Sequence, residues 1–138
     1  MNLKPIQASL IMATILISGC DNLGRTSRVA DVKKNPDLSM GRQIFFDACI
    51  RSDRHGISLY DCDNSVEMLS VEIPEKVRNS KNGKNLVESG YRQWPPGSNV
   101  EIRANLSGVL VDHRAQGGGL VFIVDKVEGL DVAKRNGI

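Results

Sequence analysis

Hydrophobic and polar residues alternate along the middle of the chain, which is the pattern of a β-strand with one buried face. The apolar positions of the first such run fall on one face: Ile44, Phe46, Ala48 and Ile50. Ile57 and Leu59 continue that face after a polar turn, RSDRHG. Residues 66–74 are rich in β-branched side chains and end at a proline, which cannot continue a sheet interior. The pattern therefore predicts three strands around one core.

The pattern changes after residue 74. Apolar and small residues recur at helical spacing over residues 83–94, and two prolines follow, so we expect a short helix there. Trp94 is predicted to plug the core over the open end of the sheet. Two longer strands are predicted over residues 100–110, with a bend at Gly108, and over residues 120–127. Residues 131–138 are predicted to be a frayed tail.

The expected order is three strands, a short helix and two strands. This order resembles the OB-fold, in which five strands close into a small barrel with a helix between the third and fourth. The resemblance covers about residues 41–130 and rests on element order. It implies an all-β fold with one short helix, namely a small five-stranded OB-like barrel. An open β-sandwich or a split meander is the alternative architecture.

The first twenty residues have the pattern of an export signal. Lys4 supplies a positive start, and the mostly apolar run over residues 6–17 is shorter than the roughly 20 residues of a membrane span. The residues ISGC, ending at Cys20, resemble the lipobox of bacterial lipoproteins. The resemblance implies that residues 1–19 are a signal peptide and that Cys20 becomes the lipidated first residue. An ordinary secreted protein with a chance cysteine is the alternative.

Asp21 follows the expected lipidation site. In enterobacterial lipoproteins an aspartate at this place resembles the signal for retention in the inner membrane. The resemblance implies a periplasm-facing protein held on the inner rather than the outer membrane, and two or three acyl chains make a stable anchor. Residues 21–40 are polar and lack sustained periodicity. We therefore expect residues 20–40 to form a flexible lipidated tether with a root-mean-square span of about 25 Å.

Three cysteines are an odd number for an exported protein. If Cys20 carries lipid, Cys49 and Cys62 remain as an even pair, which predicts a disulfide in an oxidising compartment. They flank the polar turn on neighbouring strands, where they would lie opposite or diagonal to each other. Two unpaired thiols are the alternative. A zinc site fits less well, because no C-x-x-C spacing is present.

Composition argues against nucleic acid as a partner. The net charge is only +2, and aromatic residues make up 4% of the chain, so neither a basic face nor a stacking platform is expected. No cofactor is expected either. The glycine-rich stretch at residues 116–119 lies between two predicted strands and does not open a helix, as a phosphate site would require.

Two predicted turns carry similar polar triplets, Asp53-Arg54-His55 and Asp112-His113-Arg114. If the turns met, their aspartates and histidines could bind a metal ion. The alternative is that they are solvated turn formers, because aspartate hydrogen-bonds nearby backbone. Trp94 could also stack on a ligand. His55, Trp94 and His113 are therefore candidate binding residues, and no catalytic residue is assigned, because no G-x-S-x-G elbow or similar nucleophile motif is present.

These observations favour a non-enzymatic function. We expect a lipid-anchored envelope module that binds an envelope protein or another envelope component. One alternative is a small periplasmic enzyme or metal-binding protein that uses the two turns. Another is a small inhibitor or an exclusion lipoprotein.

Overall fold

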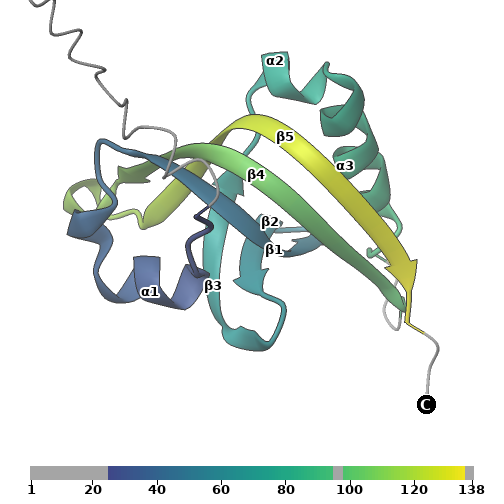
Figure 1. Cartoon of the computed structure of the whole chain (residues 1–138), viewed down its shortest axis with the longest axis horizontal. Coiled ribbons are helices and arrows are strands. Elements are labelled where there is room, and N and C mark those ends of the chain that lie inside the picture. Colours follow the sequence, from purple (N-terminus) through teal and green to yellow (C-terminus); the bar gives the residue numbers. More distant parts are fainter. Residues whose placement is uncertain (1–24, 95–97, 136–138) are drawn as a thin grey trace, which may run out of the picture.

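The computed structural model describes residues 25–94 and 98–135 (Figure 1). Five strands dominate this part of the chain: β1 (Gln43–Asp53), β2 (Gly56–Asp61), β3 (Asn64–Glu72), β4 (Val100–Asp112) and β5 (Leu120–Lys134). Three α-helices and two 3-10 turns accompany them: α1 (Val29–Lys34), η2 (Pro36–Leu38), α2 (Glu75–Arg78), α3 (Lys81–Tyr91) and η3 (Arg114–Gln116). No helix within these ranges is long and apolar enough to cross a membrane.

The five strands form one sheet that rings round on itself in the order β1-β2-β3-β5-β4. β1 joins two neighbours, because its first part pairs with β4 from Gln43 to Ile50 and its last part pairs with β2 from Cys49 to Asp53. All pairings are antiparallel except the short one between β3 and β5. The mostly β fold and the predicted order of strands are confirmed. A single helix was expected, and that part of the prediction is wrong.

The core lies inside this ring. The predicted inner face of β1 is confirmed, since Ile44, Phe46, Ala48 and Ile50 are all buried. Phe46 packs edge-to-face on Phe122 of β5, with ring centroids 4.9 Å apart. The predicted irregularity at Gly108 is present as a register shift between Ser107 and Gly108. A Cβ atom on Gly108 would lie 2.0 Å from the Ile123 carbonyl oxygen, so only glycine allows β4 to approach β5 this closely.

The N-terminal segment of the described chain, residues 27–38, belongs to the folded domain. The prediction of a flexible tether over residues 20–40 is wrong from Ser27 onward, while residues 20–24 lie outside the described part of the chain. The Ser27 N–H donates to the Phe45 carbonyl at 2.7 Å, beside the open edge of β1. Val29 and Val32 of α1 are buried in the core. Two buried residues in a six-residue helix are too few to produce a periodic signal in the sequence.

The boundaries of the later elements also differ from the prediction. β5 continues to Lys134, which pairs with Val100, so residues 131–134 are not a frayed tail. Residues 136–138 lie outside the described ranges. The predicted helix begins at Lys81 rather than Gly83, because Ser80 caps its first turn, and it ends at Tyr91. Strand β5 is longer than expected because β4 offers it a partner along the whole of its polar end.

The helices lie on opposite sides of the strands (Figure 1). α1 packs against β2 and β3, and α3 packs against β1, β4 and β5. Gly90 of α3 sits directly on β1, since a Cβ atom there would lie 3.0 Å from the Ser52 Cβ. This close approach accounts for a glycine inside a helix, where it otherwise costs about 1 kcal/mol.

Candidate binding groove

The two histidine-bearing turns do not form a common site. Asp53 lies three residues beyond the Ile50–Ile102 pair, whereas Asp112 lies three residues beyond Val109, which pairs with Gln43. The turns are therefore at opposite ends of the β1–β4 pair, and an eleven-residue strand separates them. Within residues 25–94 and 98–135 the only cluster with metal-ligand geometry is Cys49, Cys62 and Glu101. The proposed shared metal site is thus wrong.

Each of these turns is held by its own aspartate. The Asp53 Oδ1 accepts the backbone N–H of His55 at 2.7 Å, and both histidine side chains are exposed. At the other turn Arg114 donates from Nε (2.9 Å) and Nη2 (2.7 Å) to the two oxygens of Asp112. The hydrogen bonds from the Arg114 side chain and backbone lower the pKa of Asp112 to about 2. His55 and His113 thus lie in exposed turns, each of which is held by hydrogen bonds to its own aspartate.

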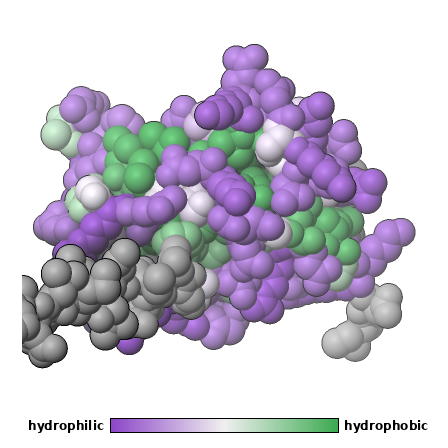
Figure 2. Space-filling model, turned by 45° about the horizontal axis from the view of Figure 1, so that its top comes forward, coloured by the Kyte–Doolittle hydropathy of each residue, from purple (hydrophilic) through white to green (hydrophobic). Residues whose placement is uncertain are grey.

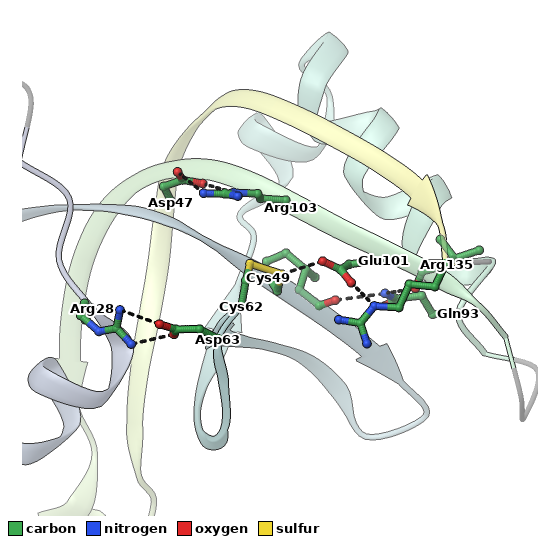
Figure 3. Close-up of a disulfide and its surroundings, with 11 residues drawn as sticks. Arg28, Asp47, Cys49, Cys62, Asp63, Gln93, Glu101, Arg103 and Arg135 are labelled. Carbon is green, nitrogen blue, oxygen red and sulfur yellow. Dashed lines mark hydrogen bonds and ion pairs between the residues drawn. A yellow bond between two sulfur atoms is a disulfide. The ribbon is translucent and has the colours of Figure 1, made fainter. Parts of the chain in front are cut away.

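The predicted disulfide between Cys49 and Cys62 is confirmed, with a Cα–Cα distance of 5.1 Å (Figure 3). Cys49 lies opposite Tyr60, and Cys62 follows two residues later in the turn between β2 and β3, so the arrangement is diagonal. The bridge holds this turn against β1. Because bridged sulfurs carry no proton and bind metals poorly, the nearby Glu101, 3.6 Å from the Cys49 sulfur, makes a contact and not a metal site.

Three arginine–carboxylate pairs surround the disulfide (Figure 3). Arg28 makes a bidentate pair with Asp63, in which Nη2 and Nη1 donate to the two carboxylate oxygens at 2.7 and 3.2 Å. Arg103 makes a similar pair with Asp47, in which Nε and Nη2 each donate at 2.8 Å. Arg135 pairs with Glu101. The hydrogen bonds from Arg28 and Arg103 lower the pKa of Asp63 and of Asp47, respectively. All three pairs keep a substantial exposed fraction, so they add order to this outer face more than stability.

A polar groove opens beside the Arg135–Glu101 pair, where β1 parts from β4. The hollow has a volume of about 370 Å³. Side chains of both charges and an aromatic ring line it: Arg51, Asp53, Tyr60, Asn99, Glu101 and Arg135. The Arg51 guanidinium lies over the Tyr60 ring, 5.9 Å from its centroid. The groove therefore offers separate donors, acceptors and an aromatic edge without a net charge.

Gln93 lines this groove and joins its two strands. Its Nε2 donates to the carbonyls of Ile50 (3.0 Å) and Val100 (3.1 Å), and its Oε1 accepts the N–H of Ser52 (2.8 Å). The side-chain amide thus satisfies backbone groups of β1 and β4 at the point where these two strands separate and no longer pair with each other. Sequence reasoning missed Gln93, because two of its partners, Ile50 and Ser52, are more than 40 residues away and no local pattern marks it.

Trp94 stands at the rim of the groove. The prediction that it plugs the core is wrong: 50% of the residue is exposed, and neighbouring Tyr91 is 59% exposed. The two rings meet edge-to-face with centroids 5.2 Å apart. The indole Nε1 donates to the hydroxyl of Ser52 at 3.1 Å, and Ser52 also lines the groove. Trp94 follows the last turn of α3, so the helical spacing no longer directs its ring into the core.

The structure places the candidate binding residues apart. None of the three candidates lines the groove itself. Trp94 adjoins it through its hydrogen bond to Ser52, His55 is exposed in the β1–β2 turn next to the groove residue Asp53, and His113 lies at the other end of the sheet. Cys20 and Asp21 lie outside the described residues. No family model, curated protein or solved structure matches the chain, so its role must be argued from these residues.

Proposed function

We propose that this protein is a bacterial envelope lipoprotein, anchored through acyl chains on Cys20 and facing the periplasm. We propose further that it binds another envelope component through the groove beside Trp94 and catalyses no reaction. The observation that carries the binding role is the exposed Tyr91–Trp94 pair next to a polar hollow. Exposed aromatic side chains that adjoin hydrogen-bonding groups are typical of recognition surfaces.

The domain is best understood as an OB-like barrel. The ring order of the strands, the parallel contact between β3 and β5 and the position of α3 between β3 and β4 all support this interpretation. OB-folds bind their ligands on a sheet face and the adjoining loops. That is an analogy from the fold, so the proposal depends on the groove residues themselves.

The position of the groove suits an anchored protein. The N-terminal segment joins β1 at Phe46, and the groove begins four to seven residues further along the strand, at Ile50 to Asp53. At about 3.3 Å per residue this separates the two by roughly 13 to 23 Å. A groove displaced in this way from the attached end can meet a partner in the periplasm.

The anchor is tested by metabolic labelling with palmitate. The wild-type protein should incorporate label and fractionate with membranes, whereas Cys20→Ala should lose both properties. Asp21→Ser should move the labelled protein from inner-membrane to outer-membrane fractions. Label that persists in Cys20→Ala would refute the anchor as assigned.

The binding role is tested by site-specific crosslinking in intact cells. A photoreactive amino acid at Asn99, inside the groove, should capture a reproducible partner that mass spectrometry identifies. The same amino acid at the exposed Val66, outside the groove lining, is the matched control. Capture should be lost when Trp94→Ala is added. Equal products from both positions, or no product at Asn99, would refute the proposed role of the groove.

A further inference from the structure

The folded domain begins close to the expected lipid. Ser27 is fixed to β1 through its 2.7 Å hydrogen bond to Phe45, and Val29 is fully buried. Only six residues separate Cys20 from Ser27. A chain of that length spans at most about 25 Å even when fully extended. If Cys20 is acylated, the surface around Ser27 must therefore lie within this distance of the bilayer.

That surface combines cationic and apolar side chains. A hollow of about 600 Å³ opens beside Ser27, and Arg25, Leu38, Arg42 and Phe45 are among its lining residues. Leu38 is 72% exposed at the end of η2. Neither Arg25 nor Arg42 forms an ion pair with another residue of the described ranges. Two free guanidinium groups beside an exposed leucine are suited to an anionic, partly apolar surface.

An apolar strip continues this surface across the sheet. Val109 of β4 lies opposite Ile123 of β5, and Val111 lies opposite Val121, all on the outer face and only partly buried. Gln43 pairs with Val109 and also lines the hollow, so the strip and the hollow adjoin. Figure 2 shows hydrophobic surface over the β4–β5 ribbon.

We propose that the hollow and the apolar strip together dock the domain onto the anionic surface of a phospholipid bilayer. This docking rests on the proposed lipid anchor, because the short connection keeps this face within about 25 Å of the membrane. The arginines would contact headgroup phosphates, and Leu38 and the valine side chains would enter the interface. The domain then lies on the membrane instead of swinging on a tether, with its Trp94 groove held away from the lipid.

Fluorescence quenching tests the orientation. The lipidated protein is reconstituted into phosphatidylglycerol vesicles whose acyl chains carry bromine, which quenches nearby tryptophan. The native Trp94 is the only tryptophan and serves as the distant control. A Trp94→Phe, Leu38→Trp variant should lose most of its emission in these vesicles, while the wild type keeps its emission. Equal quenching of both, or quenching of neither, would overturn the docking.

Flotation with vesicles tests the docking face in a protein that lacks the acyl anchor. Full chains carrying Cys20→Ala are compared, so any contribution of the leader is the same in all of them. Arg42→Gln should lower the partition onto phosphatidylglycerol vesicles about fivefold and leave the partition onto phosphatidylcholine unchanged. Leu38→Asp should lower it on both, and Val66→Asp, at an exposed valine elsewhere, should not.

These results separate the two proposals. Failure of palmitate labelling with normal flotation removes the anchor and leaves the docking face intact. Equal flotation of Arg42→Gln, Leu38→Asp and Val66→Asp removes the docking face whatever the labelling shows. If the protein forms a dimer in solution and Leu38→Asp dissociates it, the face binds a second copy of the chain. That result would also overturn the proposal.

Discussion

The helices α1 and α3, which pack against different strands of the ring, are held in different ways. α3 is eleven residues long and is capped by the preceding Ser80, whose hydroxyl accepts the N–H of Gly83 at 3.1 Å. α1 is only six residues long and lacks a side-chain cap of its own. Its first N–H groups, at Val29 (2.8 Å) and Ala30 (3.0 Å), donate instead to Asp61 at the end of β2. α3 is therefore capped by its neighbouring residue, whereas the cap of α1 comes from a residue distant in the sequence.

This difference makes the β2–β3 turn the support of the N-terminal segment. Asp61 is almost fully buried, and its carboxylate is committed to α1. Two residues further on, Asp63 binds Arg28, just before α1. Cys62, between them, is tied to β1 by the disulfide. An isolated six-residue helix is not stable in water, so α1 should persist only while this turn stays in place.

Reduction of the disulfide should have the largest effect and should separate the two helices. The bridge joins residues 13 positions apart, for which a loss of about 3 kcal/mol in the free energy of unfolding is expected. Hydrogen exchange of α1 amides should accelerate more than that of α3 amides, because only α1 relies on the bridged turn. Both thiols should become open to alkylation. Equal acceleration in the two helices would contradict the dependence.

Asp61→Ala should come next. It leaves two N–H groups of α1 without an acceptor, one of them on a fully buried residue, and we expect a loss of about 2 kcal/mol by chemical denaturation. Asp63→Ala is the matched control in the same turn. It removes only an exposed ion pair and should cost far less. If the two substitutions cost the same, Asp61 is not the cap of α1.

Ser80→Ala should have a moderate effect confined to α3. Loss of a side-chain cap costs about 1 kcal/mol, and exchange should accelerate in the first turn of α3 while α1 is unchanged. Asn85→Ala, at an exposed position of the same helix, should leave stability unchanged or raise it slightly. Loss of α1 protection in Ser80→Ala would show that the two helices are coupled.

Arg114→Gln should have the smallest effect, because the contact it removes joins residues two positions apart in an exposed turn. The pKa of Asp112 should rise from about 2 toward 3.8, which NMR titration can follow. A carboxyl whose pKa is depressed in the folded state stabilises the fold above pH 4 and loses that contribution as the pH falls toward 2. The variant should therefore show a weaker acid dependence of stability between pH 4 and 2. An unchanged pKa would contradict the assigned cause.

The features that the sequence predicts correctly depend on near neighbours. The alternation from Ile44 to Ile50 identifies the inner face of β1, and two cysteines around one turn identify the disulfide. α1 was missed because its cap is Asp61, 32 residues away. The length of β5 was missed because the partner strand determines it, and its outer residues look like those of a tail.

The groove could be predicted only in part for the same reason. Trp94 was singled out as an aromatic residue near helix-ending prolines, but its exposure depends on where α3 meets β1. Gln93 has no local signature, because its role is to join the backbones of two strands that have separated. Arg25 falls in the predicted tether and Arg42 in the predicted barrel domain, and only the fold brings the two side chains to one hollow.

The place of β5 in the ring has a consequence for how the chain is made. β5 pairs with both β3 and β4, yet it is the last strand to be synthesised. Until it arrives, β3 and β4 each present an unpaired row of backbone groups, which is a template for aggregation. These edges therefore stay exposed until β5 has been made and has paired with both strands. Removing residues of β5 should therefore be far more damaging than lengthening the surface loops.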